Sequence, residues 1–190
     1  HTDPNLENVN NTYATTWSGA EVVTSYDDTT SYLGQRSIKV NRTQAGTGGR
    51  ATQIFTTELA GGPVTLSAYI KTDNVSSSTL GACLYLLYYD ANGNHMGDIV
   101  PTYGLTGTND WQRYSLSGTL PAGVAEVRCY LFLMNATGTA WFDCVQLEKN
   151  NTASECNLLG NSDFSKNTHW TWPSDAGIVK GASYMTMPGT

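Results

Sequence analysis

The sequence has few charged residues and no long apolar run. Only 14% of its 190 residues are Asp, Glu, Lys or Arg, and the formal net charge is −6. Because proteins that bind phosphate backbones need clustered Lys and Arg, this balance argues against a nucleic acid partner. No apolar stretch approaches the roughly 20 residues of a transmembrane helix, so we expect no membrane insertion.

Cysteine is also scarce. The sequence has four, Cys83, Cys129, Cys144 and Cys156, without a CxxC spacing and without a nearby histidine. Zinc sites normally use closely spaced Cys and His ligands, so we expect no zinc site here. Cys83 and Cys129 lie inside apolar runs, where we favour buried free thiols over a cross-strand disulfide.

The residues that carry out catalysis in other proteins are almost missing. Of the three histidines, His1 is terminal, His95 flanks an Asn-Gly turn and His169 lies near the end of the chain. None is paired in the sequence with a Ser or Cys nucleophile. Glycosidases need two carboxylates across a cleft, whereas the acidic residues here lie at expected turns and strand ends. We therefore expect a protein without enzymatic activity.

Turn-forming and β-favouring residues are abundant, with 19 Gly and 11 Tyr. No segment has convincing helical periodicity, and short β-rich runs alternate with turn residues. This pattern predicts an all-β fold, a jelly-roll β-sandwich of two antiparallel sheets with a short C-terminal extension. The expected strands are residues 36–43, 50–57, 64–73, 82–90, 96–102, 111–120, 126–135 and 140–148.

Alternation along each expected strand assigns its two faces. In 64–73, Leu66, Ala68 and Ile70 are expected in the core, and Tyr69 points outward. In 50–57, placing Ile54 inward turns Gln53 outward.

The strand 126–135 places Cys129 and Leu131 in the core and turns Arg128, Tyr130 and Phe132 outward. The strand 82–90 is ambiguous, because both of its faces are apolar or aromatic. Tyr85 joins the outward set in only one of its two registers.

One phrase nearly occurs twice in the chain. Asp3-Pro4-Asn5-Leu6-Glu7-Asn8 is followed by Trp17, and Asn161-Ser162-Asp163-Phe164-Ser165-Lys166 is followed by Trp170 and Trp172. Such self-similarity indicates a modular array. We therefore expect a first module over 1–149, a linker over 150–156 and the opening of a second, incomplete module over 157–190.

The order of several motifs is familiar. They are Leu66-Ser67-Ala68-Tyr69, the segment Tyr88 to Gly93, Trp111 with Tyr114-Ser115, and the closing Trp141-Phe142-Asp143. In this order the chain resembles β-sandwich carbohydrate-binding modules of the cellulose- and xylan-binding type, found in tandem in bacterial YD-repeat (RHS-type) wall-associated proteins. The resemblance implies a secreted module at a bacterial cell surface, with a polysaccharide and neighbouring modules as partners.

The resemblance also implies a structural calcium ion that ties the first strand to the last. Its ligands would be Glu7, the neighbourhood of Gln35, and Asp143, and hard oxygen ligands of this kind suit calcium. One departure is Cys144, where the family commonly has a second Asp. The alternative for Asp143 is a turn carboxylate that accepts backbone N–H groups.

Sugar rings stack on aromatic side chains, and their hydroxyls bond to Arg, Gln and Asn. The outward set therefore predicts a binding surface of Tyr69, Tyr130, Phe132, Arg128 and Gln53, joined by Tyr85 in one of its registers. The alternative is a structural or adhesive spacer whose aromatic face is covered by loops or by a neighbouring module. The resemblance implies that Trp17, Trp111 and Trp141 pack inside the sandwich.

Overall fold

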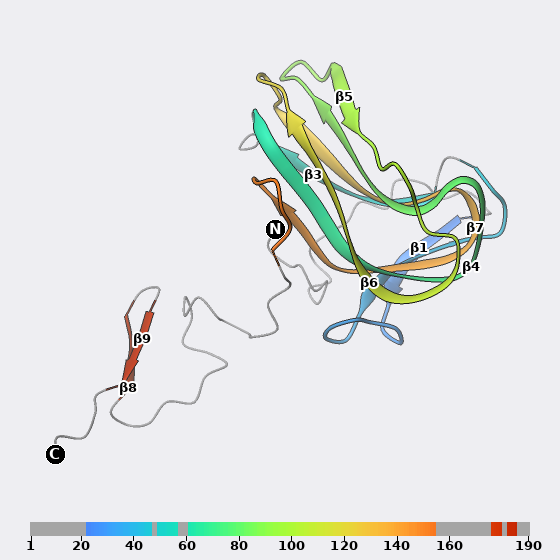
Figure 1. Ribbon diagram of the computed structural model, residues 1–190, viewed down its shortest axis with the longest axis horizontal. Helices are drawn as coiled ribbons and strands as arrows, with labels where there is room; N and C mark the ends of the chain where they lie inside the picture. Colours follow the sequence, from blue (N-terminus) through green and yellow to red (C-terminus); the bar gives the residue numbers. More distant parts are fainter. Residues whose placement is uncertain (1–21, 47–48, 57–60, 155–175, 180–181, 186–190) are drawn as a thin grey trace. The chain divides into compact units, whose positions relative to one another are not determined.

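The fold is all-β. The computed structural model describes residues 22–46, 49–56, 61–154, 176–179 and 182–185, which form nine strands and no helix (Figure 1). The chain divides into two compact units, His1–Ser154 and Glu155–Thr190. Among the described residues there is no helix that could cross a lipid bilayer.

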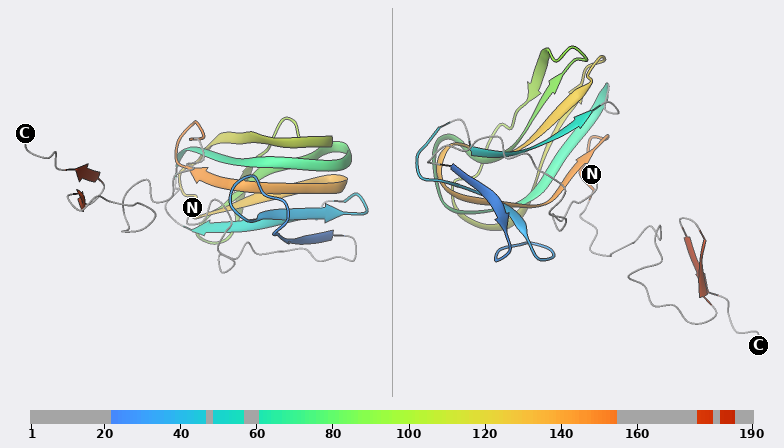
Figure 2. Two further views of the ribbon diagram at one scale, coloured as in Figure 1. Left: turned by 90° about the horizontal axis from the view of Figure 1, so that it is seen from below. Right: turned by 180° about the vertical axis from the view of Figure 1, so that it is seen from behind.

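The described residues of the first unit form seven strands, and two of them are long. β4 and β7 each curve from one layer of the sandwich into the other, so hydrogen bonds join all seven strands into one folded sheet (Figures 1 and 2). The sequence pattern predicted each long strand as two shorter ones. The strands are β1 Val22–Asp27, β2 Ser37–Arg42, β3 Gly49–Thr56, β4 Gly62–Tyr89, β5 His95–Ile99, β6 Gly107–Leu120 and β7 Glu126–Glu148.

The registers define two layers. Layer A has the order β1, β2, the second half of β7, the first half of β4, and β6. Layer B has the order β3, the first half of β7, the second half of β4, and β5. All of these pairings are antiparallel, which confirms the predicted antiparallel β-sandwich.

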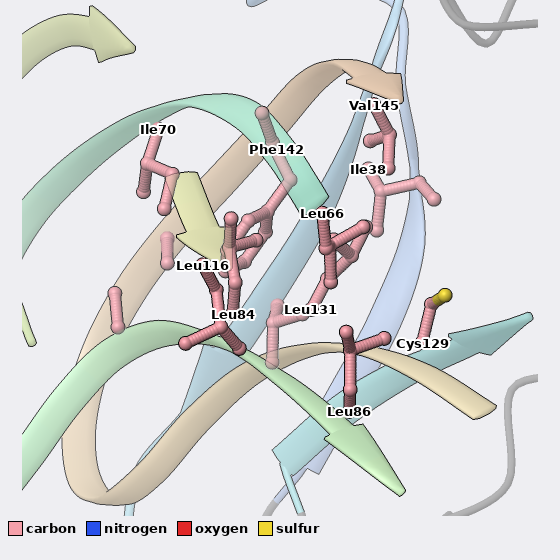
Figure 3. Packing of buried hydrophobic residues seen from close by; sticks show 14 of the residues in the cluster. Ile38, Leu66, Ile70, Leu84, Leu86, Leu116, Cys129, Leu131, Phe142 and Val145 are labelled. Carbon is pink, nitrogen blue, oxygen red and sulfur yellow. The ribbon is translucent and has the colours of Figure 1, made fainter. Parts of the chain in front are cut away.

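The hydrophobic core lies between the layers (Figure 3). Leu66 and Ile70 of layer A and Leu131 of layer B belong to one buried cluster, in which Phe142 is fully buried. These residues face inward as their alternation predicted. Leu84 and Leu86 also belong to this core, which settles the ambiguous register of the second half of β4.

The connection between β4 and β5 forms the turn that its sequence predicts. Oδ1 of Asp90 accepts the N–H groups of Asn92 at 2.8 Å and Asn94 at 2.9 Å. Gly93 has φ 80°, a conformation that glycine adopts without steric cost. The turn brings β5 back alongside β4, which places His95 opposite Tyr89.

The cysteines of layer B are free and buried, as expected. Cys129 lies in the core and Cys83 on the opposite face of the same layer. Burial raises the pKa of the Cys83 thiol to about 12, so this thiol stays protonated near neutral pH. Cys144 is also buried and forms no disulfide, and Cys156 lies outside the described residues.

In the second unit, the described residues form one antiparallel hairpin. β8, Ala176–Val179, pairs with β9, Ala182–Met185. Trp170 and Trp172 lie outside the described residues. That this unit opens a second module stays a prediction.

Candidate functional site

The outer face of layer B, on the side away from the core, carries most of the predicted binding residues. Tyr85 lies opposite Tyr130 in the register, and Cys83 lies opposite Phe132. In the next row, Leu87 lies between Asp98 of β5 and Arg128 of β7. The structure thus brings Tyr85, Arg128, Tyr130 and Phe132 together on what we call the layer B face.

The floor of the layer B face is closely packed. Tyr130 is only 7% exposed and Phe132 only 4%. The ring of Tyr85 lies 6.3 Å from that of Tyr130 and 6.2 Å from that of Phe132, measured between centroids. The face assignment of Tyr130 and Phe132 is therefore right, but the expectation that they stack on a ligand as open rings is wrong.

A polar network crosses the three strands β5, β4 and β7 on the same face. The hydroxyl of Tyr85 donates to Oδ2 of Asp98 at 2.9 Å. Nε2 of His95 lies 2.6 Å from Oδ1 of Asp98, and the His95 ring meets the edge of Tyr89 at 5.4 Å. Burial and the hydrogen bond to Asp98 raise the pKa of Tyr85 to about 12, so its hydroxyl remains a neutral donor.

Arg128 continues this network on β7. Its guanidinium lies over the ring of Tyr89 at 4.2 Å, and its Nε donates to Glu126 at 2.5 Å. Although burial alone would lower the pKa of Arg128, the bond to Glu126 raises it, and the side chain stays cationic. Tyr85, Tyr89, Arg128 and Glu126 are half-buried, whereas His95 and Asp98 are exposed.

Sequence reasoning did not place Tyr89, His95, Asp98 and Glu126 in the site. A usable signal was present, because the Asn92-Gly93 turn returns β5 antiparallel to β4. The turn predicts that residues just after it lie beside residues just before it. His95 and Asp98 could therefore have been placed near Tyr89 and Tyr85.

Tyr69 belongs to a different surface. It lies on the outer face of layer A, where its ring stacks on Tyr32 at 3.6 Å and 12°. Arg113 lies 5.2 Å from the Tyr69 ring, and Trp111 lies 6.1 Å from that of Tyr32. The prediction that grouped Tyr69 with Tyr130 is wrong, because alternation separates inside from outside but cannot tell the outer faces of two layers apart.

Gln53 lies on β3, for which only the backbone is described. The register of β3 sets Gln53 opposite Cys129, a core residue, and sets Ile54 opposite Arg128. Because the side chains of β3 lie outside the described part of the structure, the outward placement of Gln53 stays a prediction.

Asp143 is fully buried within layer A and binds backbone N–H groups. Its Oδ2 accepts the N–H groups of Tyr32 at 2.8 Å and Leu33 at 3.0 Å, and its Oδ1 accepts that of Cys144 at 2.6 Å. These contacts correspond to the alternative in which Asp143 is a hydrogen-bond acceptor that holds a loop.

The predicted calcium ligands are only partly described. Glu7 lies outside the described residues, and Gln35 lies in the loop that Asp143 holds. Within the described ranges, no three His, Cys, Asp or Glu side chains gather as a metal site. The N–H groups that point at Asp143 suit a carboxylate without help from a metal. A calcium ion at this place stays a prediction.

Trp111 and Trp141 are half-buried and lie outside the core cluster, where they contact neighbouring side chains. Trp111 lies beside Tyr32, and Trp141 lies on the outer face of layer A with Lys39 at 5.5 Å from its ring. Nε1 of Trp141 donates to Asp27 at 2.9 Å. Burial alone would raise the pKa of Asp27, but hydrogen bonds from Thr29 and Trp141 lower it well below its usual range. Trp17 lies outside the described residues.

Comparison with solved structures places the fold among carbohydrate-binding modules. The chain superposes on the family 22 modules of Clostridium thermocellum xylanase 10B. For the N-terminal CBM22-1–GH10 modules, the TM-score is 0.55 with 16% identity, covering 70% of this chain and 25% of that one. For the C-terminal module, the TM-score is 0.54 with 16% identity, covering 77% and 99%. A xylan-binding domain of family 22 gives a TM-score of 0.53 with 18% identity, covering 70% and 85%. At these identities the likeness establishes the shared fold.

Similarity in sequence points to large bacterial proteins. The chain is 34% identical over 125 residues to the tRNA nuclease WapA of Bacillus subtilis, which covers 63% of this chain. A tRNA3(Ser)-specific nuclease WapA of Bacillus spizizenii is 33% identical over 125 residues. The chain spans only 5% of the length of either relative. No protein-family model matches the chain.

Proposed function

We propose that the first unit is a non-catalytic carbohydrate-binding module that attaches a larger protein to a polysaccharide through the layer B face. The observation that carries the proposal is the polar and aromatic network of Tyr85, Asp98, His95, Tyr89 and Arg128 on one sheet face. The fold shared with xylan-binding modules supports it.

The chemistry of this network suits an uncharged sugar chain. The rings of Tyr85 and Tyr89 offer apolar surface to the C–H faces of pyranose rings. Asp98 and Glu126 accept hydrogen bonds from hydroxyl groups, while Arg128 and His95 supply donors. Among the described side chains of the face, Arg128 is neutralised by Glu126, so this pair leaves no uncompensated cation for an acidic sugar. The ligand class that fits best is a neutral polysaccharide.

Tyr130 and Phe132 support the network from below. Because both rings are buried, they fix the position of Tyr85 and do not themselves meet the ligand. Binding then depends on the half-buried upper residues of the face. This arrangement resembles a platform in which a packed floor keeps the contacting rings preorganised.

Catalysis is not part of the proposal. The two carboxylates of the face are engaged by neighbours, Asp98 by Tyr85 and His95, and Glu126 by Arg128. The nuclease activity named for the WapA proteins belongs to chains of which this sequence spans 5%. We therefore propose that this chain corresponds to a segment outside a nuclease centre. A secreted tandem array of the YD-repeat (RHS) type remains the proposed context.

A structural spacer is the second candidate, and one observation favours it. The centre of the layer B face is buried, with Phe132 at 4% and Tyr130 at 7% exposure. A spacer would use this face for packing alone. Its polar network would then serve only to bind β5 to the rest of layer B.

Affinity electrophoresis separates the two candidates. The purified chain is run in native gels that contain soluble arabinoxylan, β-glucan or mannan, and we expect retardation by at least one of them. Tyr85→Ala should weaken that retardation about five- to tenfold, because this is the loss of affinity expected when one aromatic stacking contact is removed. Tyr69→Ala, on the outer face of layer A, is the matched control and should bind as the original chain does. No retardation by any neutral polysaccharide would overturn the binding function in favour of the spacer.

A further inference from the structure

A pocket of about 220 Å³ opens where the edges of the two layers meet, between β6 and the 100–105 loop. Its floor is part of the main core, with Ile70, Leu84 and Leu116 exposed to its interior. The half-buried Tyr114 of β6 forms a wall. None of the side chains that line this edge pocket is charged. The polar network of the layer B face contributes no residue to it.

The mouth of the edge pocket exposes apolar surface that the fold does not require. Tyr103 is 67% exposed and Val100 53% exposed, and both line the pocket. They are two of the four large hydrophobic residues that the described part of the chain exposes. Burial raises the pKa of Tyr114, and the nearby Tyr103 raises it further, which is consistent with the two phenol rings flanking one opening.

The base of the 100–105 loop is fixed by a close backbone contact. Ala82 and Leu105 exchange two hydrogen bonds, at 3.0 and 2.8 Å. A Cβ atom at Gly104 would lie 1.9 Å from the carbonyl oxygen of Leu80, and one at Gly81 would lie 2.2 Å from that of Leu105. Only glycine allows this approach, so Gly81 and Gly104 let the loop backbone pack closely against β4. The pocket is therefore preformed.

Volume and polarity define what the pocket can hold. An apolar cavity of about 150 Å³ is large enough to take up a benzene ring, so this pocket has room for one ring with a small substituent. Thr102 and Ser115 line it as well. β6 pairs only with β4 among the described strands, so its other edge offers backbone donors and acceptors. A charged ligand would lose its hydration here without gaining a partner.

We propose that the edge pocket is a second binding site, which takes a single uncharged phenol-like ring. The apolar part of the ring lies against Leu84 and Leu116, between Tyr103 and Tyr114, and its hydroxyl bonds to polar groups at the mouth. Such rings occur as free phenols and as tyrosine side chains of polypeptides. The site does not depend on the proposed polysaccharide function.

The test is a titration of the isotope-labelled full chain followed by two-dimensional NMR. The probes are p-cresol as a free ring, a capped Ala-Tyr-Ala peptide as the same ring on a polypeptide, and 4-hydroxybenzoate as a charged ring. With p-cresol we expect saturable shifts at the amides of 100–105 and 114–117. Binding of p-cresol alone identifies a small-molecule site, and binding of both p-cresol and the peptide identifies a site for a tyrosine side chain. The 4-hydroxybenzoate anion should bind at least about tenfold more weakly.

Two variants at exposed positions control the experiment. Tyr103→Ala removes one wall of the mouth and should weaken p-cresol binding about fivefold or more. Because Tyr103 is mostly exposed, the variant should keep its melting temperature. Met96→Ala removes an exposed apolar residue of β5 that does not line the pocket, and it should bind unchanged. Absence of saturable shifts at 100–105 and 114–117, equal binding of the anion, or equal weakening by both variants would overturn the site.

Discussion

Replacing Asp143 by alanine is expected to lower the free energy of unfolding by about 3 kcal/mol or more. The carboxylate is fully buried and accepts the N–H groups of Tyr32, Leu33 and Cys144. Without it, buried donors lose their acceptor, and the loop that carries Tyr32 loses its attachment to layer A. Denaturant unfolding followed by tryptophan fluorescence measures the change.

Two comparisons make the Asp143 result specific. Asp143→Asn keeps one carbonyl oxygen and should cost less than alanine, while Asp98→Asn, at an exposed position, should leave stability nearly unchanged. The hydrogen bonds alone predict the same melting temperature in calcium and in EDTA. A higher melting temperature in calcium would show that the ion predicted from the sequence also acts here. Full stability of Asp143→Ala would contradict the hydrogen-bonded role.

Phe132→Ala is expected to lower the free energy of unfolding by about 3–5 kcal/mol, the usual cost of emptying a buried aromatic site. Phe132 is 4% exposed and packs with Cys83, Tyr85 and Tyr130 in a cluster separate from the main core. Tyr85→Ala, at a half-buried position, should cost considerably less. The same unfolding measurement on both variants tests the prediction.

The contrary outcome for Phe132 is equally clear. If Phe132→Ala leaves stability unchanged and abolishes retardation by polysaccharide, Phe132 is an open contact ring. The assignment of Phe132 to a packed floor beneath the layer B face would then be wrong. The first interpretation of the sequence, which placed Phe132 and Tyr130 as stacking rings, would be right.

The fold could be predicted from the sequence because its signals are local. Alternation along 64–73 and 126–135 identified the core residues Leu66, Ile70 and Leu131 correctly. The Asn92-Gly93 turn was also predictable from two residues. What the pattern could not show is that β4 and β7 each run through both layers. Between their two halves, these strands include Asn74 and Asn135 with positive φ angles that their sequence does not require.

The site was predicted only in part, for a reason of geometry. Tyr69 and Tyr130 both point outward, but a sandwich has two outer faces, and periodicity does not distinguish them. Whether an outward ring is open or covered depends on long-range packing, which explains the error at Tyr130 and Phe132.

The measurement that tests the central claim most directly is a residue-by-residue NMR titration of the labelled chain with xylohexaose. The oligosaccharide is present in the solved complex of a CBM22-1–GH10 protein, part of which shares this fold. The layer B face predicts saturable shifts at the amides of 85–89, 95–98 and 126–130, with those of Tyr32, Tyr69 and Trp111 unmoved. Shifts confined to that second group of residues, on layer A, would contradict the assignment of the site. Absence of shifts with xylohexaose and with every polysaccharide that the gels include would contradict sugar binding itself.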